Sequence, residues 1–295
     1  MANLFEVNKQ LKKSKVVVFT TVFPNSYKYL DEFLNSLQTQ TFLDFDLFIV
    51  NDGVEDLSRK IKKYDSLNTI IIDVNFTISK NREVGINHIV KLGYEYVVFI
   101  DSDDYVENNR LEVSLKKIKN FDIIVNELSL FDEKSIYNKN YFSKRIENDC
   151  RINESFIVDK NIFGLSNTTV KVSLLKGIEF NKDLKVVDWF LFNVLLSKGA
   201  TAIFTNQTKT YYRQYDDNLS SIDKYDKKYL INCISVKKDH YKEMSPINEK
   251  YKQLYRKCQA LESAVLSNNY TFDYKKENEK NLFWWEITNY LNITN

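Results

Sequence analysis

Short apolar runs alternate with segments of helical periodicity over the first 130 residues, and this alternation constrains the fold more than any other feature of the chain. The runs VVVFT, FDLFIV, TIIIDV and YVVFI begin at residues 16, 45, 69 and 96, with amphipathic stretches between them. Continuous apolar strands joined by amphipathic helices are typical of parallel sheets that are buried on both faces. The pattern therefore predicts an α/β fold with a mainly parallel sheet sandwiched by helices, in which ligands bind at the carboxyl ends of the strands.

The rest of the chain is organised differently. Up to residue 222 we expect less regular structure, with a helix from Val187 to Lys198 and two strands, ATAIFT and TKTYYRQY. From Asp223 onward the chain is rich in Lys and Tyr at helical spacing, and Pro246 separates two helices. We therefore predict one domain made of two halves, 1–130 and 131–222, followed by a helical C-terminal extension, 223–295.

Composition narrows the class of protein. Lys and Arg number 42 against 40 Asp and Glu, a formal net charge of +2, so the overall charge does not favour a nucleic-acid partner. The cysteines, Cys150, Cys233 and Cys258, form no CxxC pair, which argues against a zinc site or a disulfide framework. No run approaches the roughly 18 apolar residues of a membrane span, and no apolar leader follows Met1. We expect a cytoplasmic protein.

Polar residues gather where the strands are expected to end. They are Thr20, Thr21, Asn51, Asp52, Asp73, Asn75 and the tetrad at 101–104. In the tetrad, Asp101 and Asp103 are two residues apart on extended backbone, so both carboxylates can project to one side. Converging carboxylates suit a hard cation such as Mg²⁺ or Mn²⁺, which in turn binds phosphate oxygens. A solvated turn or a helix N-cap explains the same composition equally well.

No glycine-rich phosphate loop is present in the chain. Its six glycines form neither the P-loop pattern nor the dinucleotide-binding pattern. A phosphate group would therefore have to be held by a cation together with arginine.

Five segments, taken in order, resemble the inverting family 2 glycosyltransferases of GT-A fold. They are the run from VVVFTT to FIVNDG, then TISKNREVGIN, YVVFIDSDD, VVDWFLFNVLLSKG and YYRQYDDNLS, and together they cover about residues 15 to 222. Each segment alone is a weak signal, and their order carries the resemblance. It implies a GT-A fold and the transfer of a hexose or N-acetylhexosamine from a nucleotide sugar, most simply a UDP-sugar. The acceptor it implies is a glycan or lipid-linked glycan, in the synthesis of bacterial surface polysaccharide.

The resemblance assigns nucleotide binding to the first half of the domain and acceptor binding and catalysis to the second. Residues after the first two strands would hold the nucleoside, namely Thr20, Thr21, Asn51 and Asp52. A carboxylate at Asp52 can accept the N3–H of uracil, although a turn that merely ends a strand is the plainer interpretation of Asn-Asp-Gly alone. Arg82, in a segment similar to the family's Ala-Arg-Asn-x-Gly helix start, would lie near the nucleotide.

The resemblance also implies the catalytic roles. Asp101, Ser102 and Asp103 match the family's Asp-x-Asp, with Asp103 as the direct metal ligand and Asp101 near the ribose or the metal, which would act as a Lewis acid on the leaving diphosphate. Asp188 matches the carboxylate that takes the acceptor proton, whereas without the resemblance a helix N-cap would be the better interpretation. Arg213 matches a loop residue that assists the diphosphate.

Three departures from the family pattern keep other functions open. Glu83 stands where Asn is usual, Val187 replaces the acid before Asp188, and Tyr215 replaces a His two residues after Arg213. One alternative is therefore a catalytically degenerate GT-A-fold partner in glycan assembly. Another is a sugar nucleotidyltransferase, which would release pyrophosphate, although the basic glycine-rich loop of such enzymes is missing after the first strand.

The C-terminal extension lies outside the resemblance. Phe283, Trp284 and Trp285 form an aromatic patch among predicted helices. Core packing or a homodimer contact explains this patch, and so does a peripheral contact with the inner face of a membrane, where a lipid-linked acceptor would lie. The alternation of lysines and acids in this region favours packing.

Overall fold

The computed structural model describes residues 13–214, 226–273 and 284–294. The chain divides into two compact units. The first comprises Met1–Asn153, Phe163–Asp183 and Lys198–Arg213, and the second comprises Glu154–Ile162, Leu184–Ser197 and Gln214–Asn295. The second unit therefore combines two segments from the middle of the chain with the C-terminal helices.

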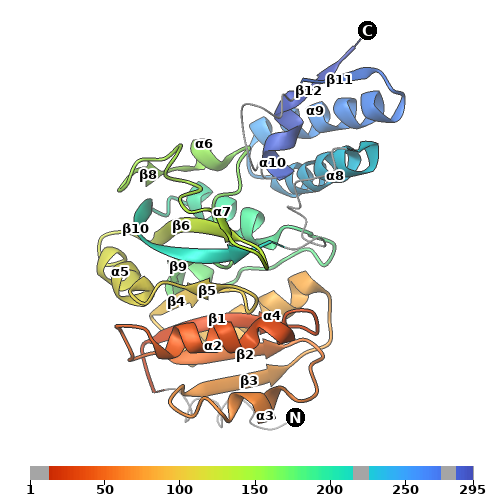
Figure 1. Ribbon diagram of the computed structural model, residues 1–295. Coiled ribbons are helices and arrows are strands. Elements are labelled where there is room, and N and C mark those ends of the chain that lie inside the picture. Colours follow the sequence, from red (N-terminus) through yellow and green to blue (C-terminus); the bar gives the residue numbers. More distant parts are fainter. Residues whose placement is uncertain (1–12, 215–225, 274–283, 295) are drawn as a thin grey trace. The chain divides into compact units, whose positions relative to one another are not determined.

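A mixed sheet forms the centre of the first unit (Figure 1). Its strands follow the order β3-β2-β1-β4-β9-β6-β10-β5, with β7 beside β6 and β8 beside β10. The strand bounds are β1 (Val16–Val22), β2 (Asp46–Asn51), β3 (Thr69–Asp73), β4 (Tyr96–Phe99), β5 (Tyr105–Val106), β6 (Ile123–Phe131), β7 (Ile136–Asn138), β8 (Arg151–Ile152), β9 (Thr168–Lys171) and β10 (Ala202–Arg213).

Most of the residue pairs between neighbouring strands of the sheet are parallel. Strands β3, β2, β1 and β4 are parallel to one another, and β6 is parallel to β10. Strand β9 is antiparallel to both of its neighbours, β4 and β6, and joins the two parallel parts. The predicted α/β fold with a mainly parallel sheet is therefore confirmed.

One detail of the strand prediction is wrong. ATAIFT and TKTYYRQY do not form two strands, because a single strand, β10, runs through both. Its register against β6 shifts between Thr205 and Lys209. The polar residues between the two runs resemble a turn in the sequence, but this irregularity accommodates them within the strand.

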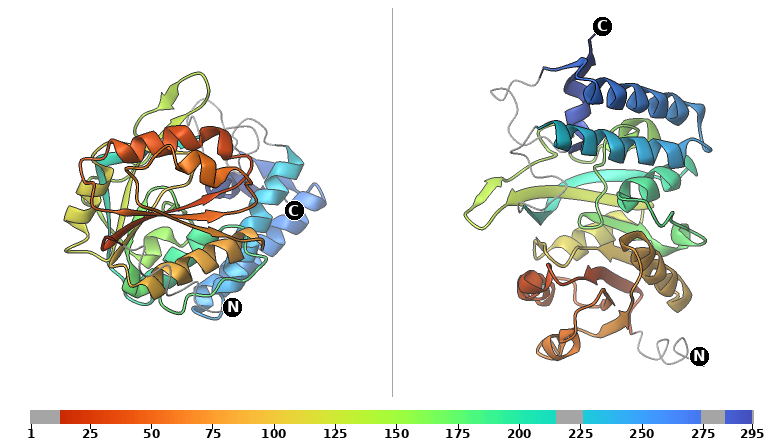
Figure 2. Two further views of the ribbon diagram at one scale, coloured as in Figure 1. Left: turned by 90° about the horizontal axis from the view of Figure 1, so that it is seen from below. Right: turned by 90° about the vertical axis from the view of Figure 1, so that its right-hand side faces the viewer.

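Helices cover both faces of the parallel strands (Figure 2). Val16 and Val18 of β1 share a core cluster with residues of α2, α3 and α5. On the opposite face, α4 lies so close to β1 that a Cβ at Gly85 would be 2.5 Å from Phe19 Cε2. The helical bounds in this unit are η1 (Tyr27–Tyr29), α2 (Leu30–Gln38), α3 (Leu57–Ile61), α4 (Ile78–Leu92), α5 (Arg110–Lys117) and η2 (Val172–Leu175).

The second unit is mainly helical, as predicted for the C-terminal extension. Helices α8 and α9 lie side by side as a hairpin (Figure 2). Asp226 and Asn248 cap them by accepting from the amides of Tyr229 (2.7 Å) and Lys250 (2.9 Å). The bounds are α6 (Glu154–Ile157), α7 (Val187–Ser197), α8 (Lys227–Met244), α9 (Glu249–Leu266), β11 (Tyr270–Phe272), α10 (Trp284–Ile287), η3 (Thr288–Tyr290) and β12 (Leu291–Ile293).

The aromatic patch of the extension is only partly described. Trp285 is buried in the second unit, whereas Phe283 and the side chain of Trp284 lie outside the described residues. In the ranges that the structure describes, no helix is both long and apolar enough to cross a membrane.

Candidate active site

The carboxyl ends of β1 and β2 bring the predicted nucleoside residues together. Thr20 and Thr21 pair with Ile49 and Val50, and the Asp52 amide donates to the Val22 carbonyl (2.8 Å). The hydroxyl oxygens of Thr20 and Thr21 are buried and have no hydrogen-bond partner among the described residues.

Asn51 organises the turn that follows β2. Its side-chain amide donates to the Val54 carbonyl (2.9 Å) and to Asp73 Oδ1 (2.7 Å), and its Oδ1 accepts from the Val54 amide (3.0 Å). Gly53 adopts the left-handed conformation that this turn requires (φ 84°). The Asp52 carboxylate is partly exposed and makes no hydrogen bond with the described residues. Asn51 thus shapes the turn and leaves Asp52 available to a ligand.

Helix α4 brings Arg82 to the end of β4. The helix begins after Thr77, whose hydroxyl accepts from the Lys80 amide. Gly85 allows its close approach to the sheet, and Arg82 Nη2 lies 3.7 Å from Asp101 Oδ1. Arg82 and Asp101 thus form a partly exposed ion pair, a contact that the sequence analysis did not predict.

The tetrad after β4 separates into exposed and buried members. Asp101 and Asp103 are partly exposed, whereas Ser102 and Asp104 are buried. The Ser102 hydroxyl is 2.8 Å from both the Thr21 carbonyl, to which it donates, and Ser26 Oγ. Ser102 thus joins the end of β4 to the end of β1.

Asp104 is a buried acid that sequence reasoning did not single out. Its Oδ1 accepts from the Arg213 amide (2.8 Å), and its Oδ2 accepts from the Ser166 hydroxyl. Burial raises the pKa of the Asp104 carboxyl well above its usual range, and the charges of Asp103 and Asp101 raise it further. Its position within the tetrad was visible in the sequence, but its burial depends on distant residues of the chain.

Arg213, the last residue of β10, holds the loop that contains the tetrad. It is 6% exposed, and its Nε donates to the Asp103 carbonyl (2.8 Å). Its Nη2 donates to Glu32 Oε2 (2.7 Å). The guanidinium lies over the rings of Tyr29 and Phe131, at 4.0 and 4.4 Å from their centroids. Tyr215, the residue that replaces the family's His, lies outside the described residues.

Asp188 belongs to the second unit. It is half-buried in the first turn of α7, and its Oδ1 accepts from the Trp189 amide (2.8 Å). A carboxylate in the first turn of a helix is stabilised by the unpaired amides there. Asp188 is the second residue of α7, and its carboxylate accepts from the amide of the next residue rather than from one two or three residues on, so it is not the N-cap that the sequence alone favoured.

The donor set of the tetrad fits a metal ion only in part. Asp101 and Asp103 offer hard oxygen ligands, and their combined negative charge favours a cation. Among the described residues, however, no three His, Cys, Asp or Glu side chains are arranged to hold an ion by themselves. A divalent cation here would need further oxygen ligands, such as those of a diphosphate.

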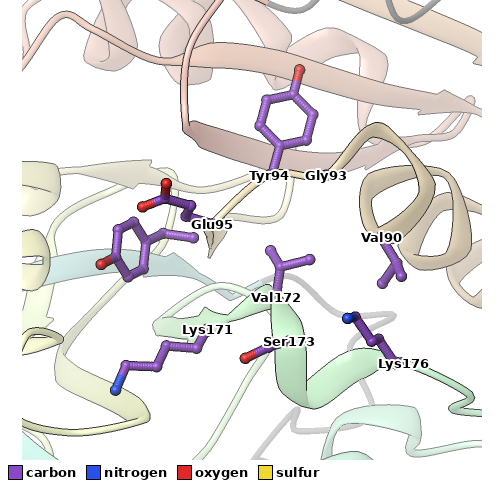
Figure 3. A pocket seen from close by; sticks show the side chains of 9 residues that line it. Val90, Gly93, Tyr94, Glu95, Lys171, Val172, Ser173 and Lys176 are labelled. Atoms are coloured by element: carbon purple, nitrogen blue, oxygen red, sulfur yellow. The ribbon is translucent and has the colours of Figure 1, made fainter.

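A separate hollow lies at the start of β4, whereas the acidic loop follows the end of this strand (Figure 3). Its volume is about 360 Å³. The Tyr94 hydroxyl points away from its lysines and donates to Asp46 Oδ2 (2.7 Å). Of its charged groups, Glu95 pairs with Lys15 (2.8 Å) and Lys171 pairs with Asp122 (3.0 Å). None of the predicted site residues lines this hollow.

Residues 18–169, about half of the 295, match the family model described as Glycosyl transferase family 2. The chain belongs to this family. With the mixed sheet and the acidic loop after β4, the match defines a family 2 domain of GT-A type, as the sequence resemblance implied.

Two similar proteins are much longer than this chain. The glycosyltransferase GlyA of Streptococcus pneumoniae is 31% identical over 150 residues, which are 47% of this chain and 21% of GlyA. The poly(ribitol-phosphate) beta-N-acetylglucosaminyltransferase TarS of Staphylococcus aureus is 28% identical over 206 residues, which are 66% of this chain and 35% of TarS. The chain thus spans between a fifth and about a third of their length.

Solved structures share the fold at low sequence identity. TarS 1–349 in complex with UDP has a TM-score of 0.61 at 18% identity, and the complex with UDP-GlcNAc has 0.60 at 19%, each covering 89% of this chain and 73% of that one. The mannosyltransferase PcManGT from Pyrobaculum calidifontis, with GDP-Man and Mn²⁺, has a TM-score of 0.56 at 14% identity and covers 87% of this chain and 76% of its own.

Proposed function

We propose that the chain is a metal-dependent inverting glycosyltransferase that moves a hexose or N-acetylhexosamine from a UDP-sugar to a glycan acceptor. The observation that carries the proposal is the acidic loop after β4. Asp101 and Asp103 stay partly exposed there, the Arg213 side chain donates to the Asp103 carbonyl, and Arg82 forms an ion pair with Asp101. A negative centre flanked by a cation suits a metal-bound diphosphate.

The uracil and ribose would bind at the ends of β1 and β2. The partly exposed Asp52 carboxylate can accept the N3–H of uracil, a hydrogen bond that cytosine could not donate. The hydroxyls of Thr20 and Thr21, which have no hydrogen-bond partner among the described residues, lie at the same edge, and Asn51 supports the turn after β2. The UDP complexes of the structural relative TarS agree with a uridine donor.

Asp101 and Asp103 would hold Mn²⁺ or Mg²⁺ together with diphosphate oxygens. When bound, the cation supplies Lewis-acid stabilisation of the leaving UDP. Arg82 would neutralise diphosphate charge as the bond to the sugar breaks, and Arg213 would keep the Asp103 carbonyl in place.

Asp188 would serve as the general base of a single displacement. The acceptor hydroxyl attacks the anomeric carbon, its proton passes to the Asp188 carboxylate, and the bond between the sugar and UDP breaks with inversion. Oδ1 of this carboxylate accepts from the Trp189 amide (2.8 Å), which fixes the orientation of one of its oxygens.

The acceptor would be a glycan or lipid-linked glycan of a bacterial surface polymer, at the cytoplasmic face of the membrane. The name of TarS, which denotes a transferase acting on poly(ribitol phosphate), supports an acceptor of this kind. The C-terminal helices would provide either a membrane contact or a homodimer contact. The predicted division into a nucleotide-sugar half, 1–130, an acceptor half, 131–222, and an extension, 223–295, forms part of this proposal.

The first test is donor hydrolysis without an acceptor. A panel of UDP-, GDP- and dTDP-sugars is incubated with Mn²⁺, and released nucleotide is measured for the wild type, Asp103→Ala and Asp188→Asn. We expect slow release from one UDP-sugar that requires Mn²⁺ and Asp103. Asp188→Asn should bind UDP normally and lose transfer once an acceptor is known, and normal transfer in this variant would remove Asp188 from the base role.

Titration of UDP with and without Mn²⁺ separates the proposal from a degenerate partner. A transferase should bind UDP more tightly with the metal even if hydrolysis is too slow to detect. Absence of binding in both conditions would favour a non-catalytic role. This alternative is based on Glu83, Val187 and Tyr215, which depart from the family pattern.

A further inference from the structure

Trp189 is the residue through which α7 is anchored in the second unit. It is fully buried, and its Nε1 donates to the Ile157 carbonyl (2.8 Å). Its backbone amide donates to Asp188 Oδ1 (2.8 Å). Because the first turn of a helix tends to fray, the orientation of the Asp188 carboxylate depends on how firmly Trp189 is held.

His240 of α8 holds the face of the Trp189 indole. The two ring centroids are 3.7 Å apart, and the ring planes differ by 5°. Tyr241 contacts the same indole edge-on at 5.6 Å. The imidazole is fully buried, and neither ring nitrogen has a hydrogen-bond partner among the described residues.

Burial without partners destabilises a folded chain, so the position of His240 is not explained by its hydrogen bonds. A phenyl ring would fill the same place without that penalty. What the imidazole of His240 provides is its flat face, which stacks on the indole of Trp189 and restricts rotation of the indole.

Tyr251 of α9 provides a second, independent link to the same residue. Its hydroxyl lies 2.8 Å from Asn193 Oδ1 and 3.2 Å from Glu154 Oε1, and Asn193 Nδ2 donates to the Trp189 carbonyl (2.9 Å). Trp189 is thus fixed at its indole N–H, at its ring face and at its carbonyl. The ring contact comes from α8, and Tyr251 of α9 supports the carbonyl contact indirectly, through Asn193.

We propose that His240 and Tyr251 are positioning residues for Asp188, acting through Trp189. The inference rests on the proposed role of Asp188 as the base, and it gives the helical extension a part in catalysis: the extension holds the base-bearing turn of α7 in one orientation. A misplacement of about 1 Å in a catalytic group can cost a factor of about 100 in rate, so loosening Trp189 should lower kcat and leave donor binding intact.

The test compares kcat and donor KM for His240→Ala, His240→Phe, Tyr251→Phe and Val265→Ala. Val265 is a fully buried residue of α9, and the helical rise places it about 21 Å along the helix from Tyr251. We expect His240→Ala to lower kcat at least about tenfold with donor KM within about twofold. His240→Phe should recover most of that loss, Tyr251→Phe should lower kcat less, and Val265→Ala should reduce thermal stability without changing kcat.

Amide hydrogen exchange of the first turn of α7 provides a readout that does not depend on turnover. Exchange at residues 187–190 should become faster in His240→Ala and return toward the wild-type rate in His240→Phe. If His240→Ala fails to fold, Tyr251→Phe carries the same comparison, because it removes a single hydroxyl group.

Two results would overturn the proposal. One is a normal kcat and unchanged exchange in His240→Ala. The other is a loss of kcat in Val265→Ala equal to that in His240→Ala, because activity would then follow stability alone. The Asp188→Asn variant keeps this failure apart from failure of the proposed function: full turnover in Asp188→Asn removes the base itself, whereas an inactive Asp188→Asn with a normal His240→Ala removes only the positioning role.

Discussion

Arg213 is a single buried cation that contacts the acidic loop after β4 through the Asp103 carbonyl. Its guanidinium is buried between two aromatic rings and makes separate hydrogen bonds to Asp103 and Glu32. A lysine could keep the charge but could not reproduce the planar stacking or the two divergent donors.

Arg213→Lys should lower the free energy of unfolding by about 1–3 kcal/mol, because the Asp103 carbonyl loses its Nε donor and the planar stacking on Tyr29 and Phe131 is lost. It should also weaken Mn²⁺-dependent binding of UDP, since the Asp103 carbonyl is no longer held. Urea denaturation and calorimetric titration check the two effects. Arg145→Lys, at an exposed arginine, is the matched control and should change stability by no more than about 0.5 kcal/mol. Unchanged UDP binding in Arg213→Lys would contradict this account.

Glu83, where the family usually has Asn, has a contact of its own in this chain. It is buried in α4, its Oε2 accepts from the Phe180 amide (2.7 Å), and its Oε1 pairs with Lys80. Beside it, the Ser79 hydroxyl donates to the Lys182 carbonyl (3.0 Å). The departure from the family pattern thus attaches the start of α4 to the segment 178–183.

Glu83→Ala should lower the free energy of unfolding by about 1–3 kcal/mol, because it leaves the buried Phe180 amide without an acceptor. Glu83→Gln keeps an acceptor oxygen and should lose clearly less. Chemical denaturation of both variants measures the difference, and equal losses would show that the hydrogen bond to Phe180 is not the stabilising contact.

At the scale of elements, the position of α4 depends on the absence of one side chain. A Cβ at Gly85 would lie 2.5 Å from Phe19 Cε2 and 2.6 Å from Val50 Cγ2. Both of these atoms belong to well-packed side chains of the sheet, so neither can move without disturbing the core.

Gly85→Ala should therefore push α4 away from β1 and β2, with a loss of about 1–3 kcal/mol in stability from overpacking. Arg82 lies on the same helix, so binding of UDP should weaken at the same time. Thermal unfolding and UDP titration test this expectation, with Lys91→Ala at an exposed position of α4 as the control. A stabilised Gly85→Ala variant with normal UDP affinity would show that the sheet can yield at this point.

At the scale of the whole molecule, the second unit carries buried basic groups that make its stability depend on pH. Burial lowers the pKa of His240 well below 6.5, and the nearby charge of Lys237 lowers it further. Burial also lowers the pKa of Lys237 to about 8, although its Nζ donates to Thr288 Oγ1 (2.7 Å).

A group whose folded pKa is depressed below its unfolded value binds protons preferentially in the unfolded chain. For His240 the second unit should therefore lose stability as the pH falls below about 6.5, by about 1.4 kcal/mol at pH 5.5. His240→Phe should lack this part of the pH dependence. Denaturant unfolding of both proteins at pH 7.5 and 5.5 provides the comparison. If both lose the same free energy of unfolding at pH 5.5, groups other than His240 cause the loss of stability in acid.

The spacing of apolar residues along the sequence was sufficient to predict the helices and strands that depend on interactions between residues close in the chain. Helix α4, the strands up to Ile100 and the C-terminal helix pair all follow from periodicity. The split of β10 into two strands was wrong, because the sequence cannot show that β6 continues alongside both parts.

The sequence by itself determined the α/β class, the family and the position of the acidic tetrad, because each depends on the order of residues along a short stretch of chain. Only the tertiary structure decided which members of that tetrad are exposed. Asp104 is buried because Ser166 and the Arg213 amide reach it from 62 and 109 residues away. In the same way, the stacking of Trp189 on His240 joins residues far apart in the chain. Contacts of this kind depend on packing between distant segments, and no local pattern contains that information.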